Sequence, residues 1–279
     1  MKKLELLDVF SYSCMNCQRS LKYIQKLHDA YARYGLRVTL LHPPEWEFEK
    51  RRGNIESFLK QNNISFPLVL DKNKKNIKKF RIDFWPTQIL VNRGEMIYKH
   101  VGEGDYQKLE KAIQKNLGVA KKPIFSSEPI YSKYPTLYPG KKKGGLQAIS
   151  NKIESKKIYG QGFKQHFEYI ENEKEGKNQV MLQLKTMGTK VFVVARSLNK
   201  ESSIIVKTKQ TITIDTAKKA MKSSNKKVIT KKMNAKGKTR KIKIGKPLLY
   251  ELISFPKPAK KIITLEFEGK IALYAFAFQ

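Results

Sequence analysis

The chain has 279 residues and a formal net charge of +33 at pH 7, because 57 lysines and arginines face 24 aspartates and glutamates. It is long enough for two domains. It contains no apolar stretch of about 18 residues, which excludes a membrane-spanning helix of ordinary composition.

The positive charge lies mostly beyond residue 118 and comes largely from lysine. A basic surface attracts nucleic acid or an anionic membrane without sequence specificity, but it also occurs as a simple solvated surface. The lysines are spread along the chain rather than gathered in one helix or tail. We therefore interpret them as a solvated surface and expect no specific nucleic-acid partner.

The first 118 residues alternate between short apolar runs and helical patterns. Gly35 ends the first predicted helix, while Asp105 caps the last one and Gly118 ends it. The predicted order is β-α-β-α-β-α-β-β-α, at residues 1–10, 17–34, 36–41, 45–61, 66–70, 71–80, 87–91, 96–101 and 106–117. This order is typical of a mixed sheet flanked by helices, so we expect an α/β domain at residues 1–118.

A linker that contains lysine, proline and serine is predicted at residues 119–127. Beyond it, apolar and polar residues alternate with a period of two, which is typical of half-buried strands. The predicted strands lie at residues 190–195, 203–206, 210–214, 240–244, 247–253, 261–267 and 271–278, and a surface loop is predicted at 218–238. We therefore expect an all-β sandwich at residues 128–279.

Two residues separate Cys14 from Cys17, and the chain has no other cysteine. The pair follows an apolar run that predicts a buried strand and opens a run with helical spacing. Cys14 is thus expected at a helix N-terminus, which favours a thiolate. Three interpretations are open: a redox dithiol, half of a zinc site, and two inert core cysteines. The redox dithiol is favoured, because zinc needs further ligands and the four histidines are scattered.

Two further residues support the redox dithiol. Asp8 lies in the predicted first strand, where burial would raise the pKa of its carboxyl and allow it to accept a proton from Cys17. The alternative is a solvated acid at a strand edge. Pro86 follows Trp85 just before an apolar run, so it is a candidate for a cis bond or for an ordinary trans proline at a strand edge.

Residues 4–117 resemble thioredoxin-like proteins of the TlpA/DipZ type. The resemblance is carried by residues 8–17, 42–50, 85–87 and 101–106, and the segment from 43 to about 63 fits the extra helix of the TlpA type. It implies that Cys14 is the nucleophile and that Cys17 resolves the mixed disulfide. It also implies a thioredoxin-like fold in which Pro86 is cis and faces the two cysteines.

The same resemblance suggests further site residues. Trp85, Pro86 and Thr87 would hold the chain of a partner protein in extended form against the sulfurs. Glu45 follows the strand end that flanks the site and is a candidate for proton handling. The favoured alternative for Glu45 is an exposed acid in the first turn of a helix, stabilised by the helix dipole.

The second half resembles the jelly-roll domain, similar to carbohydrate-binding modules, that follows the thioredoxin fold in DipZ-like proteins. Residues 135–140, 249–252, 265–267 and 274–278 carry this weaker resemblance. Sugar binding would need exposed aromatic rings, for which Tyr131, Tyr134 and Tyr138 are candidates. Packing in a core or a domain interface is the favoured interpretation of these rings, because a fold does not establish a ligand.

The sequence therefore predicts a thiol–disulfide oxidoreductase that exchanges disulfides with protein partners through Cys14 and Cys17. No cofactor and no metal is required. The resemblance suggests a CcdA-like membrane protein as electron donor. One alternative is a peroxide-reducing enzyme, because Ser11-x-x-Cys14 echoes peroxiredoxins, although Asp8 stands where those enzymes have proline. The other alternative is a non-enzymatic basic binding module.

The N-terminal residues contain no convincing signal peptide, since acidic residues interrupt the first apolar run and no small-residue cleavage site follows. A cytoplasmic location is therefore expected. The alternative is an extracytoplasmic, membrane-associated location, which the resemblance to DipZ-like proteins implies.

Overall fold

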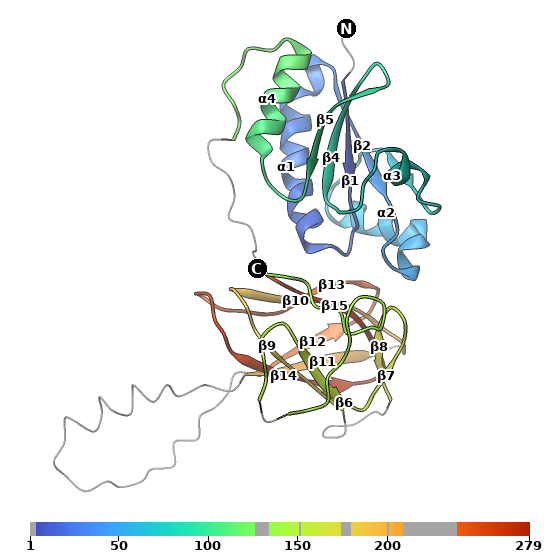
Figure 1. Ribbon diagram of the computed structural model, residues 1–279, viewed down its shortest axis with the longest axis vertical. Coiled ribbons are helices and arrows are strands. Elements are labelled where there is room, and N and C mark those ends of the chain that lie inside the picture. The colour runs from blue at the N-terminus through green and yellow to red at the C-terminus, as the bar shows by residue number, and fades with distance from the viewer. Residues whose placement is uncertain (1–3, 126–133, 151, 174–179, 200, 209–238) are drawn as a thin grey trace, which may run out of the picture. The chain divides into compact units, whose positions relative to one another are not determined.

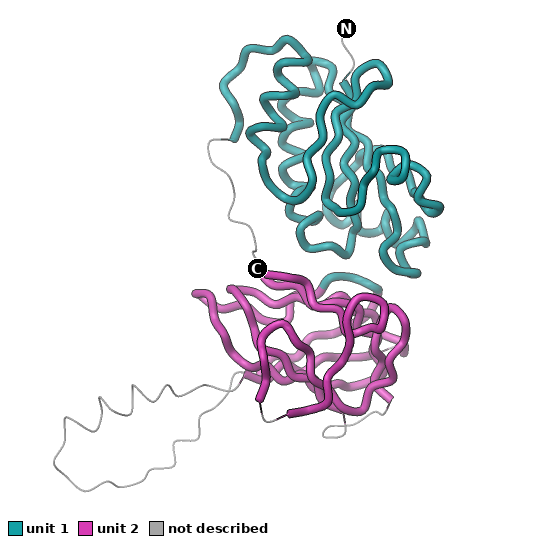
Figure 2. The backbone as a smooth tube through the Cα atoms, in the orientation of Figure 1, with its two compact units in different colours: residues 1–131, 247–249 teal, residues 132–246, 250–279 magenta. Residues whose placement is uncertain are grey.

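The structure is a computed structural model that describes residues 4–125, 134–150, 152–173, 180–199, 201–208 and 239–279. The chain divides into two compact units, one of residues 1–131 with 247–249 and one of residues 132–246 with 250–279 (Figures 1 and 2). All of the residues predicted to form the site belong to the first unit.

The order of the α-helices and strands in the first unit is the predicted one, and two short 3-10 helices, η1 and η2, were not predicted. Its elements are β1 (Leu4–Val9), α1 (Met15–Tyr31), η1 (Ala32–Tyr34), β2 (Leu36–His42), η2 (Glu47–Lys50), α2 (Arg52–Gln61), β3 (Leu68–Leu70), α3 (Lys75–Lys79), β4 (Thr87–Asn92), β5 (Glu95–Val101) and α4 (Tyr106–Leu117).

Strand β1 is the centre of the sheet, whose order is β3-β2-β1-β4-β5 (Figure 1). It runs parallel to β2 and antiparallel to β4, and the register opposes Asp8 to Gln88 and Val9 to Thr87. Leu6 and Val9 are fully buried, as expected for a central strand that is covered on both faces. The cysteine turn therefore starts from the interior of the unit.

Helices cover both faces of this sheet (Figure 1). Helices α1 and α4 pack against each other, and Tyr23 stacks on Tyr106 with ring centroids 4.2 Å apart. On the other face Ile77 of α3 joins a buried cluster with Val9 and Ile89. In the part of the chain that the structure describes, no helix is long and apolar enough to cross a membrane.

The single helix predicted at residues 45–61 is wrong, because the structure has two elements there, η2 and α2. Arg51 between them has an extended backbone, with φ −86° and ψ 104°, which interrupts the helical path. The side chain of Glu49 in η2 is fully buried and binds residues of the cysteine turn. These tertiary hydrogen bonds hold η2 as a separate tight turn.

Part of the predicted linker packs on the first unit. The Glu110 carboxylate in α4 accepts hydrogen bonds from the backbone amides of Ile124 and Phe125, at 2.8 Å and 3.3 Å. The Phe125 ring is buried and lies 5.5 Å from the ring of Tyr23, centroid to centroid. Residues 119–125 thus include an anchored end, while 126 and 127 lie outside the described residues.

Among its described residues, the second unit has two five-stranded sheets, in the orders β13-β10-β15-β8-β7 and β12-β11-β14-β9-β6. Its described strands are β6 (Ile158–Gln161), β7 (Phe163–Gln165), β8 (Ile170–Asn172), β9 (Met181–Lys185), β10 (Lys190–Ser197), β11 (Ser202–Thr208), β12 (Thr239–Ile244), β13 (Leu248–Ser254), β14 (Ile262–Glu268) and β15 (Ile271–Phe278).

Both sheets contribute to one buried cluster, which includes Val193 and Phe276 from one sheet and Val206 and Leu265 from the other. Six of the seven predicted strands correspond to β10 to β15. The predicted strand at 210–214 and the predicted loop at 218–238 lie outside the described residues. The jelly-roll resemblance stays a prediction.

Candidate active site

The cysteine turn joins β1 to α1 and places the two thiols at different depths. Cys14 is the N-cap of α1, and its amide donates to the carbonyl of Ser11 over 3.1 Å. Cys14 is partly exposed, whereas Cys17 is fully buried. Burial, followed by the interaction with Cys14, raises the pKa of the Cys17 thiol well above its usual value. The turn therefore presents one accessible sulfur and one sheltered sulfur.

Asp8 is a fully buried acid in the central strand. Burial raises the pKa of its carboxyl to about 7, and a hydrogen bond from Gln88 opposes the rise. Gln88 Nε2 lies 2.9 Å from Asp8 Oδ1, while no group among the described residues hydrogen-bonds Oδ2. The Asp8 charge also raises the pKa of Cys17, so the acid lies within electrostatic range of the buried thiol.

The proline turn lies beside the end of β1. The Trp85–Pro86 peptide bond is cis. Thr87, the next residue, opposes Val9 in the β1–β4 ladder, and its hydroxyl donates to the carbonyl of Phe84 over 2.7 Å. Phe84 is 70% exposed, whereas Pro86 and Thr87 are buried. The turn thus presents an aromatic side chain to solvent next to the strand that leads into the cysteine turn.

Two glutamates connect these turns. Glu49 Oε1 accepts hydrogen bonds from the hydroxyls of Ser11 and Ser13, at 2.6 Å and 2.7 Å. Glu49 Oε2 accepts the backbone amide of Glu45 over 2.7 Å. The carboxylate of Glu45 in turn accepts the indole N–H of Trp85 over 3.3 Å. Burial raises the pKa of the Glu49 carboxyl, and the two serine hydrogen bonds oppose the rise.

An ion pair holds Asn16, one of the two residues between the cysteines. Arg19 Nε and Nη2 donate to the two oxygens of Glu103 over 2.7 Å and 2.6 Å, which is a bidentate geometry. Arg19 Nη2 also donates to the Asn16 side-chain oxygen over 2.8 Å. The Glu103 side chain is nearly buried, so this pair ties the first turn of α1 to the loop that follows β5.

Known proteins resemble up to about half of this chain. It is 34% identical over 138 residues to Protein DipZ from Mycobacterium bovis, an alignment that spans 49% of this chain and 20% of that protein. It is 27% identical over 124 residues to the thiol-disulfide oxidoreductase ResA of Bacillus cereus, spanning 41% of this chain and 69% of that one. The first unit is therefore similar to thioredoxin-like proteins of the TlpA/DipZ type, and we call it the thioredoxin-like unit.

The chain thus spans about a fifth of the length of its DipZ relatives. The crystal structure of StoA from Bacillus subtilis is 23% identical, with a TM-score of 0.34, and the match covers 39% of this chain and 81% of that one. No family model matches the chain.

The residues that the sequence proposed for the site lie in the turns at the paired ends of β1 and β4 and in the segment after β2. Asp8 and Cys17 lie within electrostatic range of each other, and the proline turn leads directly into the strand paired with β1. Glu45 reaches this group through Trp85 rather than through a sulfur. Sequence reasoning missed four polar residues of the site, namely Arg19, Glu49, Gln88 and Glu103.

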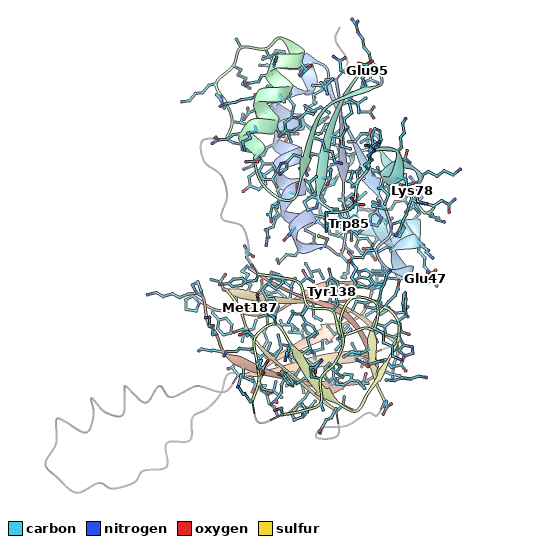
Figure 3. All side chains as sticks on the ribbon, viewed as in Figure 1. Glu47, Lys78, Trp85, Glu95, Tyr138 and Met187 are labelled. Carbon is cyan, nitrogen blue, oxygen red and sulfur yellow. The ribbon has the colours of Figure 1, made fainter. Side chains whose placement is uncertain are left out.

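A pocket of about 490 Å³ lies beside the proline turn. Trp85 and Ile82 contribute its apolar lining, and Lys74, Lys78 and Arg81 contribute positive charge. Figure 3 shows Trp85 and Lys78 in this part of the thioredoxin-like unit. Asp83 also lines it, so the proline turn borders a pocket of mixed charge in which basic side chains outnumber the acidic one.

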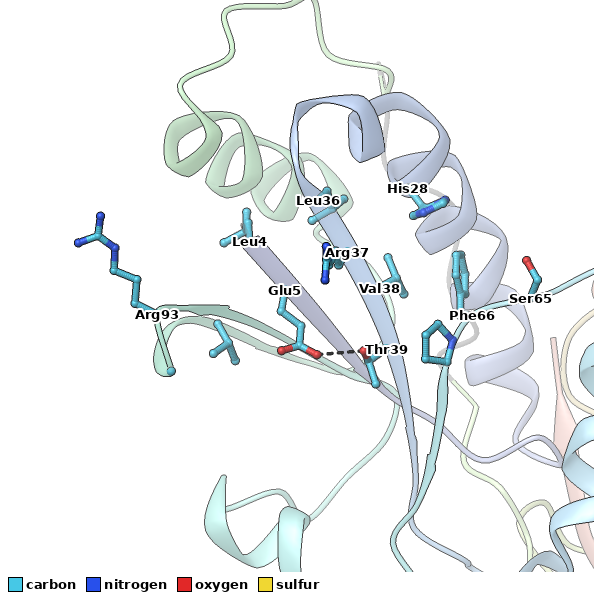
Figure 4. Close-up of a pocket in the computed structure, with 13 residues that line it drawn as sticks. Leu4, Glu5, His28, Leu36, Arg37, Val38, Thr39, Ser65, Phe66 and Arg93 are labelled. Atoms are coloured by element: carbon cyan, nitrogen blue, oxygen red, sulfur yellow. Dashed lines mark hydrogen bonds between the residues drawn. The ribbon is translucent and has the colours of Figure 1, made fainter. Parts of the chain in front are cut away.

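A second pocket, of about 540 Å³, lies at the start of β1 and β2, at the opposite end of the sheet from the cysteine turn (Figure 4). Thr39 donates a hydrogen bond to Glu5 inside it over 2.9 Å, and Arg37 and Arg93 lie at its wall. None of the residues predicted for the site lines this pocket.

Two tyrosines proposed for sugar binding are described in the second unit. Tyr134 is 38% exposed. Tyr138 is half-buried, with the Lys143 ammonium 4.7 Å from its ring centroid. Tyr131 lies outside the described residues. Within the described ranges, His, Cys, Asp and Glu side chains form no group of three that could hold a metal ion.

Proposed function

We propose that this chain is a thiol–disulfide oxidoreductase that exchanges disulfides with protein partners. The observation that carries the proposal is the unequal pair of thiols above a buried acid. Cys14 is accessible at a helix N-terminus, Cys17 is sheltered, and Asp8 has a pKa of about 7 because of its burial. The similarity to a protein named thiol-disulfide oxidoreductase ResA supports the same chemistry.

In the first step, the Cys14 thiolate attacks one sulfur of a partner disulfide. A mixed disulfide forms, and the other partner sulfur leaves as a thiolate that takes up a proton. Cys17 then gives its proton to Asp8 and attacks the Cys14 sulfur, which releases the second partner thiolate. The Cys14–Cys17 pair loses two electrons and the partner gains two, and the reverse sequence oxidises a partner.

Asp8 suits the second step because its pKa of about 7 lies near neutral pH. A general base works best when its pKa lies near the operating pH. The raised pKa of Cys17 means that this thiol stays protonated at neutral pH unless a base accepts its proton. We therefore assign the proton transfer to Asp8.

Partner binding is assigned to the proline turn. Trp85, Pro86 and Thr87 lie where β4 begins, opposite the end of β1, and exposed Phe84 lies beside them. An extended partner segment would lie along this turn with its disulfide at Cys14. The exchange needs no cofactor or metal, and a second dithiol or disulfide protein returns the pair to its starting state. A CcdA-like membrane protein is our candidate for that role.

The two alternatives have less support. A peroxide-reducing enzyme would not need a resolving cysteine two residues after the first, nor a buried acid beneath it. If the chain were only a basic binding module, the difference in exposure between Cys14 and Cys17 would have no function. For the second unit, packing stays the favoured interpretation of Tyr134 and Tyr138, and sugar binding stays the alternative. The jelly-roll assignment and the cytoplasmic location, with its extracytoplasmic alternative, stay predictions.

Reduction of insulin disulfides by dithiothreitol tests the proposed activity. The native chain should accelerate the reaction, and Cys14→Ser should abolish the acceleration. Cys17→Ser should retain the first attack and accumulate mixed disulfides that gel electrophoresis detects without reductant. Acceleration by the Cys14→Ser variant at the native rate would overturn the proposal.

A further inference from the structure

Glu49 is a buried carboxylate that touches neither sulfur but binds both serines of the cysteine turn. Its side chain is fully buried, and Ser11 and Ser13 are buried as well. Both serine hydroxyls donate to the same oxygen, Oε1, over 2.6 Å and 2.7 Å. Charge-assisted hydrogen bonds of this kind are stronger than neutral ones. The carboxylate therefore fixes the segment that immediately precedes Cys14.

Ser11 carries this restraint to both cysteines. Its carbonyl accepts the amide of Cys14 over 3.1 Å, at the N-cap of α1. A backbone hydrogen bond from Ser11 also lowers the pKa of Cys17 and so opposes the larger effect of burial. The side chain of Ser11 thus binds Glu49, while its backbone forms hydrogen bonds with Cys14 and Cys17.

The second oxygen of Glu49 faces the proline turn. Oε2 accepts the backbone amide of Glu45 over 2.7 Å, and Glu45 accepts the indole N–H of Trp85 over 3.3 Å. Trp85 precedes Pro86, whose carbonyl accepts the amide of Gly102 over 2.8 Å. One carboxylate therefore connects the segment that holds the thiols with the segment to which we assign partner binding.

We propose that Glu49 is a positioning residue that aligns the cysteine turn with the proline turn by holding Ser11 against both cysteines. The proposal rests on the proposed dithiol chemistry and adds a residue to it. Glu49 exchanges no proton or electron with the partner. Its effect reaches the reaction through the backbone amide of Ser11 and through Trp85.

A Glu49 that positions Ser11 and a Glu49 that acts only through its charge predict opposite changes in the pKa of Cys17 when Glu49 is replaced. If Ser11 moves away when Glu49 is lost, the Cys17 thiolate loses a hydrogen bond and the pKa of Cys17 rises. If Glu49 acted only as a nearby negative charge, its loss would lower the pKa of Cys17. The other titratable groups that act on Cys17 are Cys14 and Asp8. The sign of the change therefore identifies the role.

The test uses the full chain with Cys14→Ser, which leaves Cys17 as its single cysteine and removes the coupling between the thiols. Titration of the ¹³Cβ chemical shift of Cys17 gives the midpoint of its ionisation. Adding Glu49→Gln should raise this midpoint by roughly half a unit to one unit, the value of one modest hydrogen bond. The matched control Glu47→Gln changes an exposed acid on the same turn and should leave the midpoint unchanged.

An unchanged or lowered Cys17 midpoint in folded Glu49→Gln would overturn the positioning role. If that variant does not fold, Ser11→Ala replaces it, because it keeps the backbone amide and removes only the hydroxyl that Glu49 holds. The Ser11→Ala midpoint should also rise, and an unchanged or lowered value has the same consequence. This titration needs no partner protein, so its outcome is independent of insulin reduction, whose failure in the native chain would instead contradict the proposed function.

Discussion

The side-chain amide of Gln88 donates a hydrogen bond to the carboxylate of Asp8, with 2.9 Å between Nε2 and Oδ1, directly across the ladder of β1 and β4. This contact stabilises the charged acid and opposes the effect of its burial, so that the pKa of Asp8 is about 7. Without such a partner, burial alone would favour the neutral acid more strongly. Gln88 therefore keeps the pKa of Asp8 near neutral pH, which is where the proton transfer with Cys17 that we propose requires it.

Asp8→Asn should slow the resolving step while leaving the first attack intact. The asparagine keeps the shape of the side chain but cannot accept the proton of Cys17. We expect turnover in insulin reduction at pH 7 to fall by roughly 100-fold and mixed disulfides to accumulate. The loss should shrink at high pH, where Cys17 ionises unaided. Glu5→Gln, on the same strand, is the control, and overlapping pH–rate profiles for Asp8→Asn and the native chain would contradict the role.

The same acid should make stability depend on pH. The pKa of Asp8 is raised from 3.8 to about 7, so between these values the folded state binds more protons than the unfolded state. The free energy of unfolding therefore falls as pH rises through this window, by at most about 4 kcal/mol. Asp8→Asn should flatten this dependence and be the more stable protein at pH 8. Urea unfolding of both proteins at several pH values measures this, and parallel pH dependences would contradict a buried acid.

The two cysteines should react in a fixed order. Cys14 is partly exposed, whereas Cys17 is buried and its pKa is raised by burial. Iodoacetamide should therefore label Cys14 first in the reduced protein at mildly acidic pH. Mass spectrometry of tryptic peptides after short exposures shows the order. Equal labelling of the two cysteines would contradict the assignment of Cys14 as the nucleophile. Labelling of Cys17 first would assign that role to Cys17.

Phe84 should contribute to partner binding and little to the fold, because 70% of it is exposed beside the proline turn. Phe84→Ala should raise KM for a protein disulfide roughly fivefold, as expected for losing about 1 kcal/mol of apolar contact. The value of kcat and the melting temperature should stay close to those of the native chain. Phe167→Ala, which removes a ring of 66% exposure in the second unit, is the control. Equal KM values in both variants would remove Phe84 from the binding surface.

The sequence predicted those features of the unit that local patterns encode. Apolar runs and helical spacing sufficed for the order from β1 to α4, and a Cys-x-x-Cys after a strand sufficed for the position of the thiols. Asp8 was accessible to the same reasoning, because an acid inside an apolar run is conspicuous. These patterns all lie within a few residues of the feature that they predict.

Glu49 was missed because its partners lie far away in the chain. Ser11 is 38 residues from it, and nothing in the run from Glu45 to Lys50 indicates that Glu49 turns inward while Glu47 stays exposed. Strands β6 to β9 were missed as well, and two of them, β7 and β8, have only three residues each. Three residues are too few to establish a period of two.

The end of the linker at Ile124 and Phe125 is held by Glu110 through contacts that the sequence did not predict. Glu110 is buried in α4 and binds the amides of Ile124 and Phe125 and the hydroxyl of Tyr31. Burial, followed by the interaction with Glu110, raises the pKa of Tyr31 to about 12, so the tyrosine stays a neutral donor to the carboxylate at physiological pH. The carboxylate thus satisfies three donors at once.

Glu110→Ala should leave these donors without a partner and lower the free energy of unfolding by roughly 2–3 kcal/mol. Local opening should also expose the segment around Lys121, so that trypsin cleaves there faster than in the native chain. Lys111→Ala, an exposed neighbour on the same helix, is the control and should change neither quantity. If the Glu110→Ala variant were cleaved as fast as the native chain and unfolded at the same urea concentration, the Glu110 carboxylate would not hold the linker. Faster cleavage with an unchanged free energy of unfolding would instead show that Glu110 holds only the segment from Ile124 onward. The amides of Ile124 and Phe125 would then be released without the unfolding of α4.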